Sequence, residues 1–432
     1  MTLRLSTRDK DFARAFDKLV RGRRESDIEV SRDVTAIIAD VKARGDAALI
    51  DYTARFDGHS LIGGGWSIGK DECAAAYAAL SDELRDALDL AASRIRAYHE
   101  VQLPQDRDST DSAGVRLGAR WTAVDAAGLY VPGGRAAYPS SLLMNAIPAR
   151  VAGVERLVVV TPTPKGKINP LVLAAAHLAG VDEVWRIGGA QAVAALAFGT
   201  ANIRAVDVVT GPGNAWVAEA KRQLYGVVGI DMVAGPSEIV VVSDARSDPE
   251  WIAADLLSQS EHDPASQSIL FTDDAAFADI VADLVGVQLA SLSTEKVAAR
   301  AWHDNGAIIV VDDLDAAMPL VNRLAAEHLE LAVDNPQALF DQVRHAGSVF
   351  LGRLTPEAVG DYVAGPNHVL PTGRRARFSS GLSVLDFMKR TSFIELGREG
   401  LAAIGPAAVA LAEMEGLPAH ADSVRRRLAN PA

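Results

Sequence analysis

The segment VVTGPGNAWVAEAKRQL, residues 208–224, indicates the fold class, because it changes within a few residues from a strand pattern through a glycine turn to a helix pattern. RIGGAQAVAAL, residues 186–196, has the same order, and GLYVPGGRAAYPSS, residues 128–141, also leads from a strand into a helical run. In open α/β sheets, phosphate groups bind at helix N-termini that follow such turns. None of the three turns matches GxGxxG, so each is weak evidence for a nucleotide site when taken alone.

Short β-branched runs continue around these turns, and helical stretches of roughly ten to fifteen residues separate most of them. This alternation predicts an α/β fold with two Rossmann-like, doubly wound domains whose sheets are largely parallel. The runs are RLVVVTP (156–162), DEVWRIGG (182–189), VDVVTGPGN (206–214), SEIVVVSD (237–244), SQSILFTDD (266–274), GAIIVVDD (306–313) and GSVFLG (347–352).

The two ends of the chain have a different pattern. The first hundred or so residues show mostly helical spacing, with breaks at Gly45 and Ser81, and after Gly373 the segments 382–396 and 398–432 again favour helices. We therefore expect a helical N-terminal segment (1–25), a discontinuous first α/β domain (26–129 with 238–380), a second Rossmann-like α/β domain (130–237), and a helical C-terminal arm (381–432) that contacts a partner subunit.

Composition restricts the class of protein. The chain has 432 residues, of which 49% are hydrophobic and 23% charged, which is typical of a globular protein with two or more domains. The net charge of -13, without a basic stripe, argues against binding to nucleic acid or to an anionic membrane. The N-terminus has no signal-peptide pattern, and the apolar runs are too short to span a bilayer, so we expect a cytoplasmic protein.

Four side chains offer nitrogen and oxygen ligands for one divalent metal ion. The single cysteine, Cys73, excludes a thiolate cluster, so the ligands must be histidine, carboxylate or amide groups, which suits zinc or manganese. Gln259 and His262 lie three residues apart on an expected helix and share one face. Asp361 lies in a Gly/Pro-rich loop, and His420 joins this set only if the fold or a second subunit brings it there.

The adjacent pair Glu327 and His328 stands where an expected helix ends and a strand begins. A carboxylate beside an imidazole is suited to proton transfer near neutral pH, although the pattern alone favours a solvated helix end. Ser237 lacks the setting of a GxSxG nucleophile and is better interpreted as a turn serine. For His368, in the loop after Asp361, a hydrogen bond to the backbone is favoured over catalysis.

Ten ordered segments together closely resemble histidinol dehydrogenase over nearly the whole chain. They are GLYVPGG (128–134), GGAQAVAALAFGT (188–200), GPGNAWVAEAKRQ (211–223), AGPSEI (234–239), DLLSQSEHDPASQ (255–267), EHLEL (327–331), GSVFLG (347–352), GDYVAGPNHVLPT (360–372), FSSGLSVLDF (378–387) and EGLPAHADSV (415–424). The resemblance implies a homodimeric, zinc-dependent, NAD-linked enzyme of histidine biosynthesis, which oxidises L-histidinol through L-histidinal to L-histidine.

The resemblance also implies roles for individual residues. One zinc ion per subunit would be held by Gln259, His262, Asp361 and His420, with the last supplied by the partner. The acid/base pair would be Glu327 and His328. The substrate would contact Ser237, Gln259, His262, His328, Asp361, Glu415 and His420. NAD would contact Tyr130, Gln191 and Asn214.

Three alternatives remain at the level of sequence. The first is a related zinc- and NAD-dependent dehydrogenase of another small polar alcohol; Ser237 and Glu415 favour histidinol, because they supply contacts on the amine side. The second is a zinc hydrolase, in which the strand–glycine–helix turns would have no role. The third is a non-catalytic binding protein, against which the intact acid/base pair argues.

Overall fold

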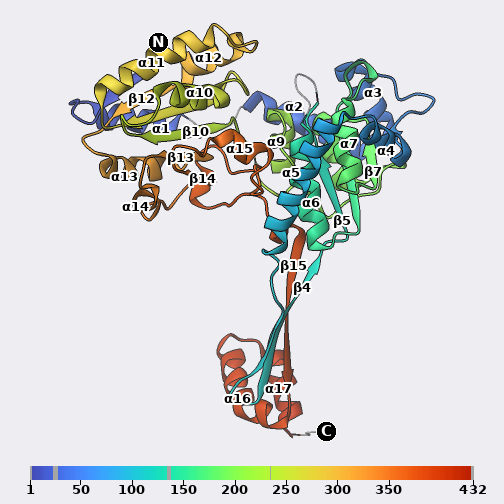
Figure 1. Cartoon of the computed structure of the whole chain (residues 1–432). Coiled ribbons are helices and arrows are strands. Elements are labelled where there is room, and N and C mark those ends of the chain that lie inside the picture. Colours follow the sequence, from blue (N-terminus) through green and yellow to red (C-terminus); the bar gives the residue numbers. More distant parts are fainter. Residues whose placement is uncertain (1, 23–27, 134–137, 234, 430–432) are drawn as a thin grey trace.

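Two six-stranded sheets form the body of the molecule (Figure 1). The structure is a computed structural model that describes residues 2–22, 28–133, 138–233 and 235–429. Both sheets are parallel except for one antiparallel edge strand, and helices cover both faces of each, as the alternating sequence pattern predicts. Among the described residues, no helix combines the length and the apolar character needed to cross a membrane.

The first sheet is wholly parallel, and helices cover both of its faces. Its strands, in spatial order, are β1 (Leu3–Ser6), β12 (Ala307–Val310), β11 (Gln267–Thr272), β10 (Glu238–Ser243), β13 (His328–Ala332) and β14 (Ser348–Leu351). One face packs on α10 (Pro249–Ser260), α11 (Ala275–Leu289) and α12 (Glu295–Asn305), and the other on α1 (Phe12–Arg21), α13 (Leu314–Leu324) and α14 (Pro336–Phe340). Alternate side chains of β10 point into these two cores: Val240 and Val242 into one, Ile239 and Val241 into the other.

The second sheet has the same construction. Its strands are β2 (Ser67–Ile68), β7 (Glu183–Trp185), β6 (Arg156–Val160), β5 (Ala126–Tyr130), β8 (Val208–Thr210) and β9 (Gly229–Ile230), with β2 antiparallel to β7. One face packs on α2 (Ile28–Arg44), α3 (Asp46–Asp57), α8 (Gly189–Phe198) and α9 (Ala215–Leu224). The other packs on α4 (Lys70–Ala78), α5 (Asp82–Glu100), α6 (Pro139–Ala152) and α7 (Pro170–Leu178).

The expected grouping of residues 26–129 with the first sheet is wrong. Helices α2 to α5 pack on the second sheet, and β2 and β5 are two of its strands. Conversely, β1 of the N-terminal segment pairs with β12 in the first sheet. Helical spacing shows which face of a helix is buried but not which sheet it covers, so the sequence could not decide between the two. The predicted boundary at residue 25 lies outside the described residues.

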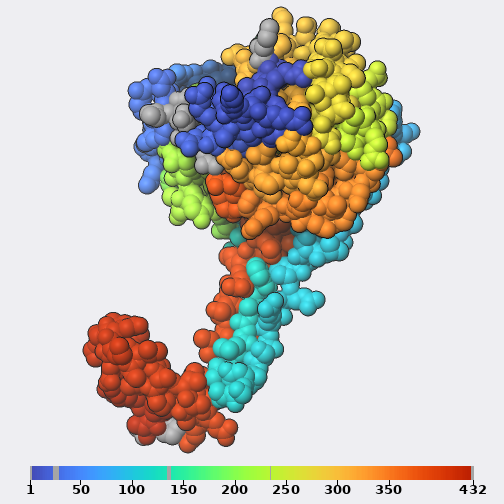
Figure 2. Space-filling view, turned by 90° about the vertical axis from the view of Figure 1, so that its left-hand side faces the viewer, coloured from blue at the N-terminus to red at the C-terminus, as the bar shows by residue number. Residues whose placement is uncertain are grey.

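The C-terminal arm is carried by a β-ribbon, which corrects the prediction of a helix over residues 382–396. β15 (Met388–Leu396) pairs antiparallel with β4 (Val115–Ala123), and β4 pairs with β3 (Arg107–Thr110). The ribbon ends in α16 (Arg398–Met414) and α17 (Pro418–Ala429), which pack on each other away from the body (Figures 1 and 2). The arm therefore projects as a separate unit. Met414, at the end of α16, is 88% exposed.

Candidate active site

The predicted acid/base residues and Gln259 lie at the amino-terminal edge of the first sheet. Glu238 is the first residue of β10, and His328 is the first residue of β13. Helix α10 runs back to this edge and carries Gln259 in its last turn. The body has two lobes, each built around one of the six-stranded sheets. The short helix α15 (Glu357–Tyr362) follows β14 and lies between the two lobes (Figure 1). Ligands of open α/β sheets usually bind at the opposite, carboxyl edge, so this position is unusual for the fold.

Glu327 and His328 are buried, with only 6% and 4% of their surfaces exposed, so the solvated helix end favoured by the pattern is wrong. The reason is local. Helix α13 ends at Leu324, and Ala325 takes a left-handed conformation (φ 46°) that turns the chain directly into β13. Since β13 is a central strand between β10 and β14, the first side chains after the turn are enclosed by its neighbours.

Backbone groups of Glu238 contact both members of this pair. The Glu238 N–H donates to Glu327 Oε2 at 2.9 Å, and the Glu238 carbonyl oxygen accepts from His328 Nδ1 at 3.2 Å. A carbonyl oxygen only accepts, so Nδ1 carries the proton and His328 Nε2 has the free lone pair. Burial lowers the pKa of His328 and raises the pKa of Glu327 well above its usual value. The imidazole is therefore neutral near pH 7 and able to accept a proton at Nε2.

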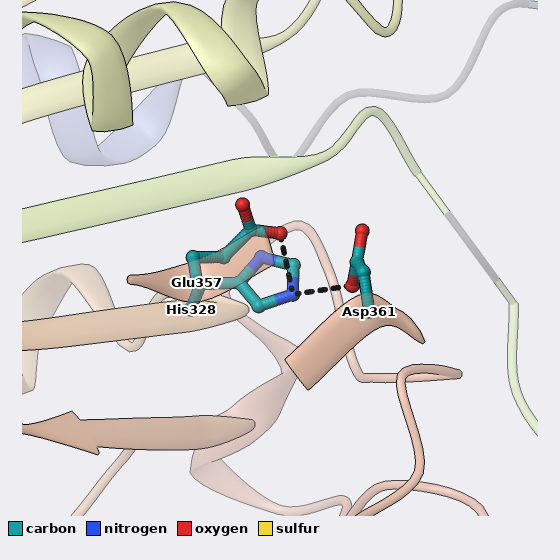
Figure 3. Close-up of side chains that lie close together, drawn as sticks. All are labelled: His328, Glu357 and Asp361. Atoms are coloured by element: carbon teal, nitrogen blue, oxygen red, sulfur yellow. Dashed lines mark ion pairs between the residues drawn. The ribbon is translucent and has the colours of Figure 1, made fainter. Parts of the chain in front are cut away.

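Two carboxylates face this nitrogen (Figure 3). His328 Nε2 lies 3.6 Å from Glu357 Oε1 and 3.8 Å from Asp361 Oδ1. One ligand atom from each of the three residues falls within 4.8 Å of the others, a spacing suited to a metal ion. Burial, with a smaller contribution from Glu357, raises the pKa of Asp361 to about 8. A nearby divalent cation would reverse this effect, because it favours the ionised carboxylate.

Glu357 is a residue of this cluster that was not predicted from the sequence. Its signal was present, because Glu357 and Asp361 are four residues apart and such positions share one face of a helix. The intervening Gly360 and the Gly/Pro-rich residues that follow favoured a loop instead. In the structure, α15 is a helix of six residues that presents both carboxylates to the imidazole.

The side-chain amide of Gln259 is available to bind a metal ion or a substrate. Its side chain is fully buried, yet neither Oε1 nor Nε2 has a hydrogen-bond partner among the described residues. An unsatisfied buried amide is costly, and one such group calls for an explanation. His328 Nε2 and Glu357 Oε1 also have no hydrogen-bond partner in that part of the chain. The last turn of α10 reaches the cluster, because Ser258 Oγ donates to Glu357 Oε2 at 3.1 Å. Amide oxygen, imidazole and carboxylate groups can together bind a divalent cation.

His262 lies two residues after the end of α10 and is exposed. A positive charge on its ring would lower the pKa of both His328 and His368, so His262 lies near these two rings. His368 itself bonds to the backbone as predicted: its Nδ1 donates to the Asp361 carbonyl oxygen at 2.8 Å. Its Nε2 lies 3.2 Å from Ser141 Oγ of α6, which links the site to the second lobe.

The three predicted NAD contacts lie at turns of the second sheet. Tyr130 ends β5, and its hydroxyl accepts from the Gly189 N–H at 3.0 Å, at the start of α8. Gln191 is buried in the first turn of α8. Asn214 caps α9, because its Oδ1 accepts from the Val217 N–H at 3.1 Å. The turns thus lie at the carboxyl ends of β5, β7 and β8, the edge where nucleotides bind in such folds.

The sequence matches the family described as histidinol dehydrogenase over residues 20–428. The chain belongs to this family. A histidinol dehydrogenase from Zymomonas mobilis is 65% identical over 99% of this chain and 100% of its own length, and one from Rhodospirillum rubrum is 63% identical over 99% of each. A crystal structure of histidinol dehydrogenase from Elizabethkingia anophelis, 36% identical, superimposes with a TM-score of 0.92 over 99% of this chain and 98% of its own.

Membership of the histidinol dehydrogenase family confirms the resemblance seen in the sequence and the expected NAD-dependent oxidoreductase of histidine biosynthesis. It leaves the residue assignments to the geometry. The body brings Gln259, Asp361, Glu327 and His328 to one edge of the first sheet, and Ser237 lies half-exposed in the turn before β10. Glu415 and His420 do not join them within this chain, because both are exposed on the projecting arm (Figure 1).

Proposed function

We propose that this protein oxidises L-histidinol through L-histidinal to L-histidine and delivers two hydrides, one after the other, to NAD. The observation that carries the proposal is the cluster of His328, Glu357 and Asp361, together with the buried, unsatisfied amide of Gln259 on α10, the helix whose Ser258 bonds to Glu357. It combines a neutral base with a ligand set for zinc on a scaffold that has nucleotide-type turns in its second lobe.

Gln259, His262 and Asp361 would hold one zinc ion together with the partner subunit's His420. When bound, zinc would supply a Lewis-acid site for nitrogen groups of the substrate and so help to position its alcohol carbon. Glu415 of the partner subunit and Ser237 would complete the contacts to the amine side of the substrate. Tyr130, Gln191 and Asn214 would hold NAD at the turns of the second sheet.

His328 is the proposed general base of the first oxidation. Its Nε2 accepts the hydroxyl proton while the hydride leaves the alcohol carbon for the nicotinamide. Its Nδ1 remains bonded to the Glu238 carbonyl, which fixes the tautomer and stabilises the imidazolium that forms.

Glu327 is proposed to act on the aldehyde. Its raised pKa makes the ionised carboxylate a stronger base, able to take a proton from the water that adds to the carbonyl carbon. His328 must release its first proton to solvent before the second oxidation. The hydrate then gives up a second hydride, and the neutral His328 again accepts the hydroxyl proton. Because the aldehyde must stay bound between the two steps, an enclosed site shared by two subunits suits the reaction.

The cytoplasmic location expected from the sequence stays a prediction.

The direct test is stoichiometric. Purified, zinc-loaded protein is mixed with L-histidinol and excess NAD, and histidine and NADH are quantified together. We expect two NADH for each histidine formed. A product mixture of free histidinal with one NADH, or no NADH at all, would contradict the proposal.

The variant His328→Ala separates the role of a base from that of a metal ligand. We expect zinc content to stay near that of the wild type while kcat falls about 10²- to 10⁴-fold, the usual contribution of a general base. Zinc is measured by elemental analysis and kcat from NADH absorbance. The control is His303→Ala, which removes an exposed imidazole on α12 and should change neither. Loss of zinc in His328→Ala would instead assign His328 to the metal.

A further inference from the structure

Glu238 connects the proposed acid/base pair to the interior of the first sheet. Its backbone N–H holds Glu327 and its carbonyl oxygen holds His328, at 2.9 and 3.2 Å. The position of both catalytic groups therefore depends on where the first residue of β10 lies. Both contacts come from the backbone of Glu238 and not from a side chain.

A buried arginine fixes the side chain of Glu238. Arg374 Nη1 lies 3.2 Å from Glu238 Oε1, and both side chains are only 1% exposed. Arg374 Nη2 donates to Gln267 Oε1 at 2.6 Å and reaches the Leu19 carbonyl oxygen at 3.5 Å. Gln267 begins β11, and Leu19 belongs to α1. One guanidinium thus ties together the starts of two neighbouring strands and the helix that packs beside them.

This arrangement is costly for the fold. An ion pair removed from water gains little or no net stability, because desolvation offsets the attraction between the charges. Arg374 also has a left-handed backbone conformation (φ 67°), which a residue with a side chain rarely adopts. Costly features of this kind persist where the surrounding structure uses them to hold a functional group in place.

We propose that the buried Arg374–Glu238 ion pair is a positioning device that holds Glu327 and His328 in their reactive arrangement. Arg374 and Glu238 are positioning residues. Ile239 is the partner of His328 in the sheet, so the side chain of the preceding Glu238 points to the opposite face, where Arg374 contacts it. The inference rests on the proposed roles of Glu327 and His328. It predicts that disturbing the pair lowers turnover while substrate binding and zinc content change little.

The test uses the full-length, zinc-loaded enzyme and three variants. Arg374→Met removes the guanidinium, Glu238→Met/Arg374→Met removes both buried charges, and Arg374→Lys keeps one charge but not the contacts to Gln267 and Leu19. We expect kcat to fall about 10- to 100-fold in the first two variants, the usual loss for supporting partners of this kind. The KM values for histidinol and NAD should stay within about two-fold of wild type, and Arg374→Lys should recover part of kcat.

The double variant separates positioning from simple charge balance. If the pair only neutralises buried charges, removing both should restore stability and kcat together. If the pair positions the catalytic groups, thermal stability recovers relative to Arg374→Met, but kcat stays low. The control is Arg156→Met, which breaks a part-buried pair with Glu183 (2.7 Å) in the second sheet and should lower stability without lowering kcat.

Two reference variants, Glu327→Gln and His328→Ala, distinguish the possible failures. Full activity in these two would overturn the proposed function of the pair itself. Low activity in these two, together with wild-type kcat in the zinc-loaded double variant, would overturn the positioning inference alone. If Arg374→Met does not fold, the double variant and Arg374→Lys still decide the matter.

Discussion

Glu330 is a buried carboxyl group whose ionisation should control stability at alkaline pH. It lies on β13, hydrogen-bonded to Asp255 of α10 and near Glu357 of α15, and burial together with Asp255 raises its pKa to about 10. The unfolded chain ionises this group near its ordinary value of 4.5, so the folded state holds a proton that the unfolded state has lost. Stability from this group is thus complete below pH 4.5 and is lost progressively as pH rises toward 10.

Glu330→Gln removes this loss, because glutamine does not ionise and can still donate a hydrogen bond to Asp255. We expect the variant to gain stability over wild type by roughly 1 kcal/mol per pH unit between pH 6 and pH 9. The measurement is urea unfolding at several pH values. Glu155→Gln, which removes an exposed carboxylate, is the control for net charge. A difference that stays constant with pH would show that Glu330 is not protonated in the folded protein.

The turn between β8 and α9 requires glycine at position 211. Gly211 has a φ of +110°, and an added Cβ would lie 2.2 Å from the Tyr130 carbonyl oxygen. Its N–H donates to Asp231 at 2.8 Å, and its carbonyl oxygen accepts from Lys221 Nζ at 3.0 Å. Both charged side chains are buried, so they hold the backbone of the turn in place. A substitution must therefore displace this turn or the end of β5.

Gly211→Ala should raise the KM for NAD about ten-fold or more, the effect of losing about 1.4 kcal/mol of binding, because Asn214 or Tyr130 must move. The control is Gly226→Ala, whose φ is +102° but whose added Cβ would meet nothing within 4 Å. Both variants introduce backbone strain, because both glycines have a positive φ. Only Gly211→Ala also places a Cβ against the Tyr130 carbonyl oxygen. Steady-state kinetics and thermal melts measure both effects, and equal KM values for the two variants would count against the NAD assignment of this turn.

The two sheets could be predicted from sequence because their signal is local. Most strands of residues 156–352 are apolar runs bounded by turns and followed by a helix. β9 (Gly229–Ile230) differs, because it has only two residues and leads to β10 without a helix. β15 could not be predicted in this way, since its partner β4 lies far away in the sequence and exposed strands lack an apolar run. The site could likewise be predicted only in part. The pair Glu327 and His328 was visible in the sequence as a motif, but its burial could not be predicted, because it depends on the neighbouring strands β10 and β14.

The projecting arm carries His420, one of the proposed zinc ligands, away from the other proposed ligands on the body. His420 lies on α17 at the end of the ribbon, away from the cluster on the first sheet (Figure 1). Apolar side chains on the same unit, including Leu411 and Met414, are exposed by 63% and 88%. Such side chains are expected to be covered by another surface. We therefore expect the arm to reach the body of a second copy.

Mixed dimers test this exchange. A chain with His328→Ala has a defective body and an intact arm, and a chain with His420→Ala has the reverse. If arms are exchanged, each mixed dimer contains one intact site and one doubly defective site, so purified mixed dimers should show about one half of wild-type activity per dimer. The chains are co-expressed with different tags and the mixed dimers purified, with turnover and zinc measured in each. Mixing His328→Ala with Glu327→Gln, both defective in the body, should restore nothing. Inactive mixed dimers of the first kind would mean that each site is built from one chain.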